Sequence, residues 1–432
     1  FYRNGPNPVF KPKNLYHPFD GDGMVHAVYI RDGKASYRNS YIHTAALQHE
    51  LAEHKAVWPG VMGPFDYSLP DFPIKDTGNT DVILFNGQLL PTWYNAGVPY
   101  SMNPLTLENT GVFDLKGRSR RNMSAHSHVD WNTGELRFMD YGDEAPFMTY
   151  GVANPDGTLR QEIEIDIPGP RLPHDLGFTT NYTILHDLPF FHDINVLRNH
   201  NMRVLKFHRD IPARFGIIPR YGQSNDIRWF DCEPCFILHV SNCWEEGEWV
   251  VMDGCRSVNP MPNATNEDGA LSHMLAYMRL EANNYRWRFN LDTGKTTEEH
   301  IDERYLEFGT INQHYAGVKS RYLYSTTTEP GWFLFNGIVK HDLDTGDSSN
   351  LYLGDNRYGG EAPFAAKVGA QSEDDGYLIS FVTDLNQNRS ECIIVDAKNI
   401  EAGPVCTIVL PHQISSGTHA TWASHEEIAE YR

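Results

Sequence analysis

The stretch NLDTGK, from Asn290 to Lys295, shows the kind of turn on which the fold of this chain depends. Asp292 and Gly294 suit a tight hairpin, because aspartate bonds to its own backbone and glycine readily adopts a positive φ. Two similar stretches occur, VDWNTGEL at 129–136 and HDLDTGDS at 341–348. Each lies between two short apolar runs, so we expect three β-hairpins.

The spacing of these turns predicts a repeated unit. Asp344 follows Asp292 by 52 residues (344 − 292), and Asp292 follows Asn132 by 160 (292 − 132), about three times as far. Repeats of about 50 residues are typical of propeller blades. Short apolar runs separated by Gly, Pro, Asn and Asp recur along most of the chain, which favours an all-β fold. We therefore predict a β-propeller in which residues 1–432 form one domain, with its clearest helix over 44–58, capped by Thr44.

Composition restricts the partners of the protein. The formal net charge of −20 argues against nucleic-acid binding, for which a basic surface is expected. No apolar run is long enough to cross a bilayer, so we expect a cytoplasmic protein without stable membrane insertion. Peripheral membrane contact and the oligomeric state stay open. The chain begins at Phe1, so a targeting segment ahead of it stays open as well.

The six cysteines do not form an obvious metal motif. Cys232 and Cys235 make a C-x-x-C, but the next two, Cys243 and Cys255, are 12 residues apart (255 − 243). A zinc site prefers two close pairs. We interpret the cysteines as core thiols of a reducing compartment, with zinc as the weaker alternative.

Four of the 20 histidines lie in unusually apolar or turn-flanked strand contexts: His126, His174, His239 and His419. His239, for example, interrupts PCFILHVSNCWEEG (234–247), which is apolar on both faces as in a strand covered on both sides. No local metal motif joins the four residues. Taken singly, each is most simply a hydrogen-bonded core histidine.

Several long motifs change this interpretation. YHPFDGDGMVHAVYI (16–30), GNTDV (78–82), LPHDLGFTTNYTIL (172–185), LHVSNCWEEG (238–247) and GGEAPFAAKVGAQSEDDGYLISFV (359–382) occur in order along the chain. Together they resemble the signatures of the carotenoid cleavage oxygenase family. The resemblance implies a seven-bladed β-propeller with a cap of loops and helices over a metal site on its axis.

The resemblance also implies the ligands of that metal. The family's four iron-binding histidines fall on His126, His174, His239 and His419, with His128 as a rival for the first position. Four neutral imidazoles suit Fe(II) and leave a position open for O2.

A ligating histidine usually donates its other N–H to a carboxylate. The resemblance implies Glu307 as the partner of His239 and Glu361 as the partner of His419. At the third such position Asn95 replaces the usual glutamate, facing His174. The two glutamates of WEEG, at 245 and 246, are not expected to serve as partners.

The activity implied is that of a non-haem Fe(II) dioxygenase that splits a conjugated C=C bond with O2 into two carbonyl products. An uncharged alkene needs an apolar wall, for which the candidates are Phe19, Thr80, Tyr94, Leu238 and Phe308; each is also compatible with ordinary core packing. We expect an apocarotenoid or carotenoid-like substrate. The alternatives are a stilbene or phenylpropenoid, although Tyr94 stands where stilbene cleavers carry a lysine, and a propeller that binds a lipid-like ligand without turnover.

Overall fold

The computed structural model describes residues 1–11, 13, 16–95, 97–118, 122–261, 279–328 and 332–429. The chain divides into two compact units. Unit 1 comprises Phe1–Arg171, Phe191–Lys206 and Ser415–Arg432, and unit 2 comprises Leu172–Phe190 and Phe207–Ile414. That one domain spans residues 1–432 stays a prediction.

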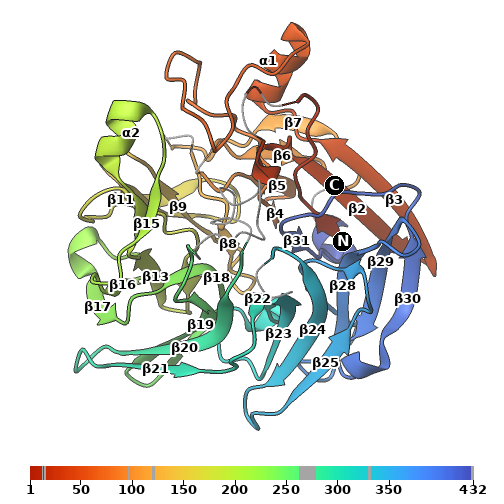
Figure 1. Cartoon of the computed structure of the whole chain (residues 1–432). Helices are drawn as coiled ribbons and strands as arrows, with labels where there is room; N and C mark the ends of the chain where they lie inside the picture. Colours follow the sequence, from red (N-terminus) through yellow and green to blue (C-terminus); the bar gives the residue numbers. More distant parts are fainter. Residues whose placement is uncertain are drawn as a thin grey trace. The chain divides into compact units, whose positions relative to one another are not determined.

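Unit 1 contains three antiparallel four-stranded sheets (Figure 1). The first has the order β3-β2-β1-β31 and joins both ends of the chain, with bounds Lys34–Tyr41, Met24–Arg31, Tyr2–Arg3 and Ala420–Thr421. The second runs from β4 to β7, with bounds Asp81–Phe85, Gln88–Thr92, Tyr100–Met102 and Asn109–Val112. The third runs from β8 to β11, with bounds His128–Val129, Leu136–Tyr141, Met148–Ala153 and Leu159–Glu164.

The described residues of unit 2 form four antiparallel sheets, three with four strands and one with five. The first is β12-β13-β16-β17, with bounds Gly177–Phe178, Tyr182–Asp187, Ala213–Pro219 and Arg228–Cys232. The second runs from β18 to β21, with bounds Phe236–Glu246, Trp249–Ser257, Ala282–Asn290 and Thr296–His300. The third runs from β22 to β25, with bounds Leu306–Thr310, Tyr322–Thr328, Phe335–Asp342 and Ser348–Tyr352. The fourth combines β26 to β30, with bounds Arg357–Tyr358, Phe364–Ala366, Gly376–Asp384, Arg389–Asp396 and Pro404–Val409.

The remaining elements are short. Strands β14 (Phe190–His192) and β15 (Leu205–Phe207) form a two-stranded sheet, with α2 (Ile194–His200) between them in the sequence. The other helices are α1 (Ala45–Glu53) and α4 (His425–Ala429), and the 3-10 helices are η1 (Pro18–Asp20), η2 (Ser224–Asp226), η4 (Gln313–Tyr315) and η5 (Ile400–Ala402). In the described part of the chain, strand residues therefore far outnumber helical residues, as predicted.

The three predicted hairpins are confirmed, but the spacing argument is only partly right. Their glycines have φ of 72° (Gly134), 73° (Gly294) and 79° (Gly346). The turns before β21 and β25 both join the third and fourth strands of successive sheets, whereas the turn before β9 joins the first and second. The 52-residue spacing is thus a true repeat and the 160-residue spacing is not. A turn with an Asx residue and a glycine suits a hairpin between any two neighbouring strands, so it does not mark one position within a sheet.

The predicted helix begins where expected and ends early. The Thr44 side chain accepts the Leu47 N–H at 3.0 Å, so Thr44 is the N-cap of α1. His54 takes the left-handed conformation and ends the helix, so the prediction that it continues to Trp58 is wrong. The buried Glu50 carboxylate accepts the N–H groups of Val57 (2.7 Å) and Trp58 (3.3 Å), which favours a turn over another helical turn.

All six cysteines are free thiols, and all but Cys406 are buried. Burial raises the pKa of the Cys235 thiol to about 12. A thiol with so high a pKa stays protonated and behaves as a small apolar group. The interpretation as core thiols is therefore right for the five buried cysteines and wrong for Cys406, which lies on the exposed strand β30.

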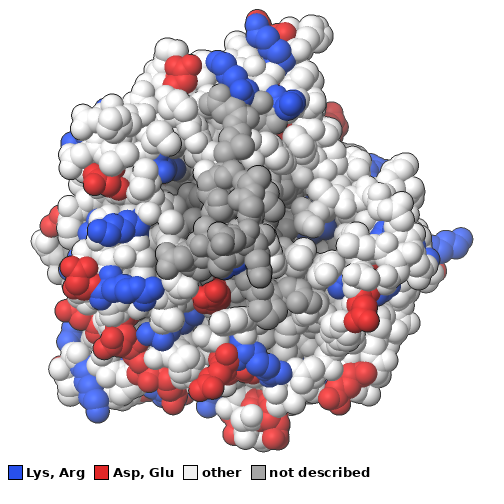
Figure 2. Space-filling model, in the orientation of Figure 1, with Lys and Arg blue, Asp and Glu red and all other residues white. Residues whose placement is uncertain are grey.

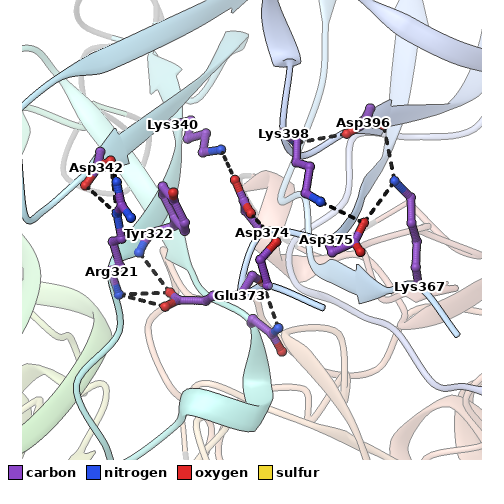
Figure 3. Close-up of polar contacts among 12 residues, drawn as sticks. Arg321, Tyr322, Lys340, Asp342, Lys367, Glu373, Asp374, Asp375, Asp396 and Lys398 are labelled. Carbon is purple, nitrogen blue, oxygen red and sulfur yellow. Dashed lines mark hydrogen bonds and ion pairs between the residues drawn. The ribbon is translucent and has the colours of Figure 1, made fainter. Parts of the chain in front are cut away.

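An ionic network joins the last two sheets of unit 2 (Figure 3). In the loop before β28, Glu373 accepts the backbone N–H groups of Arg321 and Tyr322 at 2.8–3.0 Å, and Asp374 pairs with Lys340 at 2.8 Å. This loop therefore links the sheet of β26 to β30 with strands β23 and β24 of the preceding sheet.

Charged side chains of both signs are interspersed on the face drawn in Figure 2. Among the described residues, no helix has the length and apolar character needed to span a bilayer.

Candidate metal centre

His126 and His419 form a close pair in unit 1. Their ring centroids are 4.5 Å apart with the planes nearly perpendicular, and the residues are 3% and 7% exposed. In unit 1, the side chains of Asp81, His126 and His419 lie close enough together to hold one metal ion. His128, the rival for the first ligand position, lies in β8 and is not part of this group.

The edge formed by β4 and β5 positions both histidines. The backbone N–H of His419 donates to the Thr80 carbonyl at 3.2 Å, and the Thr92 hydroxyl donates to the carbonyl of Ala125 at 2.9 Å. Thr80 N–H in turn donates to the Thr92 carbonyl at 3.0 Å. Thr80 therefore holds the segment of His419, and Thr92 holds the segment of His126. The two threonines are bonded to each other through their backbones.

Asp81 is a site residue that the sequence analysis missed. Its Oδ2 lies 3.1 Å from His126 Nδ1, and its Oδ1 accepts the Val82 N–H at 2.7 Å. Burial acts to raise the pKa of Asp81, but the neighbouring His419 and His126 outweigh it and hold the pKa below its usual range. The only signal was its place directly after Thr80 in GNTDV, which did not distinguish it from a surface aspartate.

His174 and His239 form the corresponding pair in unit 2, with ring centroids 5.5 Å apart. His239 lies on β18, and its Nδ1 is 2.6 Å from Oε2 of Glu307, a fully buried carboxylate on β22. Glu307 is thus placed where the resemblance implied. Asp175, next to His174, accepts the N–H of Val240 at 2.7 Å, so the two histidine segments are tied together.

A strained bulge in β22 sets the geometry around Glu307. The pairing of β22 with β23 shifts register after Glu307, and Phe308 has a φ of 51°, a conformation that bulky residues rarely adopt. In this conformation the Phe308 N–H donates to Glu307 Oε2 at 2.9 Å, and its ring stacks on His239 with centroids 5.0 Å apart. A Cβ at Gly309 would lie 2.0 Å from Ser241 Oγ, so the bulge also requires glycine there.

The glutamates of WEEG serve elsewhere, as expected. Glu245 accepts hydrogen bonds from Thr179 and Asn181. Glu246 accepts from Trp244 Nε1 at 2.9 Å and Arg288 at 2.8 Å. Neither is the partner of His239.

Asn95 has a partner that the sequence did not predict. Its Oδ1 accepts a hydrogen bond from Arg203, which also pairs with Asp143 at 3.0 Å; Asp143 lies 2.9 Å from His192. The predicted pairing of Asn95 with His174 and that of Glu361 with His419 each involve residues of different units and stay predictions. Glu361 itself is partly buried, between β26 and β27.

The candidate substrate residues fall into two groups. In unit 1 the Tyr94 N–H donates to the Thr80 hydroxyl at 3.0 Å, and the rings of Phe19 and Tyr94 are 6.3 Å apart. In unit 2, Leu238 and Phe308 share an apolar cluster whose other members are Leu280, Phe333 and Phe335. In unit 1 the candidates lie beside Thr80, whose carbonyl is bonded to the His419 N–H. In unit 2 they include Phe308, whose ring stacks on His239.

The donor chemistry of each pair fits a metal such as iron. A carboxylate at Nδ1 selects the tautomer in which Nε2 is unprotonated and can ligate, and this holds for His126 with Asp81 and for His239 with Glu307. Imidazole nitrogen is a good ligand for iron and also for zinc, copper and nickel.

Comparisons with known proteins agree with this chemistry. The family model described as retinal pigment epithelial membrane protein matches residues 1–424. The carotenoid 9,10(9',10')-cleavage dioxygenase of Crocus sativus is 35% identical over 99% of this chain and 84% of its own length. Two solved structures, the lignostilbene dioxygenase of Pseudomonas brassicacearum and the cobalt-substituted ACO of Synechocystis, match with TM-scores of 0.86 at 26% and 25% identity. Each alignment covers 98% of this chain and 91% of the solved chain.

These matches confirm the predicted seven-bladed β-propeller, with three of the seven sheets in unit 1 and four in unit 2 of the described chain. The chain belongs to the carotenoid cleavage oxygenase family, the family of the retinal pigment epithelial membrane protein.

Proposed function

We propose that this protein is a non-haem Fe(II) dioxygenase that cleaves a conjugated C=C bond of an apocarotenoid or carotenoid-like substrate into two aldehydes. The observation that carries the proposal is the presence of two histidine pairs, buried except for the partly buried His174, each with a carboxylate on Nδ1 of one ring. The names of the relatives, carotenoid and lignostilbene dioxygenases among them, support the reaction class.

His126, His174, His239 and His419 would hold the iron. Four neutral imidazoles leave the full charge of Fe(II) uncompensated within the ligand shell and leave coordination positions open. When bound, the iron supplies the activation of O2, so that both oxygen atoms enter the products and no external reductant is required.

The residues of this chain contribute orientation and exclusion of water. Glu307 holds the ring of His239 in the ligating tautomer. The Phe308 ring stacked on His239, with Leu238, Phe333 and Phe335 around it, forms an apolar wall against which a polyene can lie. Because such an alkene has no charge, its alignment depends on this shape rather than on ion pairs.

Two measurements test the reaction class. Metal analysis of purified protein should give about one iron per chain, and turnover in 18O2 should label the new carbonyl oxygen of both products. Iron-free protein that cannot be loaded with Fe(II) would exclude the proposal. Retained iron without O2 uptake on any conjugated alkene would instead indicate a ligand-binding propeller, and product formed without O2 would indicate isomerisation or hydrolysis.

A stilbene or phenylpropenoid is the second candidate substrate. It is favoured by the likeness to the lignostilbene dioxygenase and by the aromatic pair Phe19 and Tyr94 beside Thr80. A panel of apocarotenals, hydroxystilbenes and isoeugenol-like compounds, with the aldehydes identified by mass, distinguishes the two. Cleavage restricted to compounds with a 4-hydroxyphenyl ring would assign the second class.

A further inference from the structure

We infer that Asp81 is the carboxylate partner of the proposed iron ligand His126, and that it positions His126 so that Nε2 binds the metal. The inference rests on the proposed function and adds to it a residue that acts through the ligand. Asp81 Oδ2 lies 3.1 Å from His126 Nδ1, and the two side chains are 14% and 4% exposed.

The backbone of β4 fixes the position of the Asp81 carboxylate. Asp81 begins β4, where it pairs with Thr92 of β5, and its second oxygen accepts the Val82 N–H at 2.7 Å. The Thr92 hydroxyl meanwhile bonds to the carbonyl of Ala125, the residue before His126. Thr92 therefore holds both members of the Asp81–His126 pair, one by strand pairing and the other through the preceding residue, and the pair is preorganised.

Unit 2 contains the same device. Glu307 binds Nδ1 of His239 and also accepts the N–H of the next residue, Phe308. Asp81 binds Nδ1 of His126 and accepts the N–H of its own next residue, Val82. In both cases the carboxylate accepts the backbone N–H of the following residue and lies within hydrogen-bond distance of Nδ1, the ring nitrogen that would not bind the metal. A carboxylate in that place fixes the histidine tautomer and strengthens the ligand.

The test compares Asp81→Asn with the matched control Asp302→Asn. Asp302 pairs with His341 at 2.8 Å and is similarly buried, but it lies in the connection between β21 and β22 and has no place in the proposed metal centre. Iron affinity is measured by competition with a chromogenic chelator. We expect Asp81→Asn to lower it 10- to 100-fold, the range found for the loss of such partners, and Asp302→Asn to leave it unchanged. Asp81→Ser, which is too short to reach His126, provides a second variant if the first does not fold.

A spectroscopic readout separates positioning from general damage. In zinc-loaded protein, imidazole N–H protons bonded to carboxylates resonate at low field, and Asp81→Asn should shift one of them while the His239 signal stays. Unchanged iron affinity would overturn the inference. Lower affinity with every low-field proton in place would also overturn it, since Asp81 would then act as a direct ligand or as a mere structural support. Wild-type protein that binds no iron would instead refute the proposed function itself.

Discussion

Replacing Glu307 with glutamine removes one negative charge and leaves two hydrogen bonds intact. Both His239 Nδ1, at 2.6 Å, and the Phe308 N–H, at 2.9 Å, are bonded to the same oxygen, Oε2. A glutamine amide oxygen in that place can accept from both donors. Glu307→Gln therefore isolates the charge of the carboxylate from its role in holding the bulge.

We expect Glu307→Gln to fold normally and to bind iron 10- to 100-fold more weakly, which corresponds to about 1.4–2.8 kcal/mol. Glu307→Ala differs because it leaves two buried donors without an acceptor. At about 1–3 kcal/mol for each unsatisfied group, its free energy of unfolding should fall by about 2–6 kcal/mol.

The assays are chelator competition for iron affinity and chemical denaturation of the metal-free protein for stability. Glu246→Gln is the matched control, because this glutamate lies on β18 with His239 but bonds to Trp244 and Arg288. Equal iron affinity for Glu307→Gln and wild type would refute the reasoning about charge. Equal stability of Glu307→Ala and wild type would refute the assigned hydrogen bonds.

Four further changes have defined outcomes. His239→Ala should abolish iron-dependent cleavage, as followed by aldehyde release, and cleavage at the wild-type rate would remove His239 from the ligand set. Burial lowers the pKa of His186 to about 4, below the unfolded value of about 6.5, so its contribution to stability is lost as the pH falls from 6.5 to 4. Between pH 6.5 and 4, the unfolding free energy of the wild type should therefore fall by about 3 kcal/mol more than that of His186→Phe, and an identical pH profile for the two proteins would contradict the assigned burial. Glu373→Ala frees the N–H of the exposed Arg321, which water can satisfy, and that of the partly buried Tyr322; it should therefore cost about 1–3 kcal/mol in urea denaturation, whereas no change would show that water replaces the carboxylate at both. Thr44→Ala should cost about 1 kcal/mol through loss of the α1 cap, and a Thr44→Ser variant that is equally destabilised would argue against capping.

Local features of the fold were predictable because their physics is local. The hairpins follow from an Asx residue and a glycine within three positions, and the start of α1 follows from Thr44. The end of α1 was not predictable, since it depends on the bonds of Glu50 to a turn seven residues later.

The histidines of the candidate centre and the partner Glu307 could be named from motifs, but other contacts of the site could not. Asp81 and His126 are 45 residues apart, and Asn95 and Arg203 are 108 apart, with no sequence pattern joining either pair. The Phe308 bulge is equally hidden, because nothing in LEFGTIN favours a positive φ at a phenylalanine. Such contacts are set by how the strands pair, which the sequence pattern of one segment does not determine.

The pairing of β31 with β1 makes the position of a proposed ligand depend on a strand that is distant in the sequence. His419 is held by the first few residues, since the Asn4 N–H donates to the His419 carbonyl at 2.9 Å and the Thr418 N–H donates to the Asn4 carbonyl at 3.0 Å. The segment that carries this proposed ligand is therefore ordered only when it meets residues 415 positions away in the sequence (419 − 4 = 415). A substitution that weakens β1 should thus loosen His419 without changing any residue near it in the sequence.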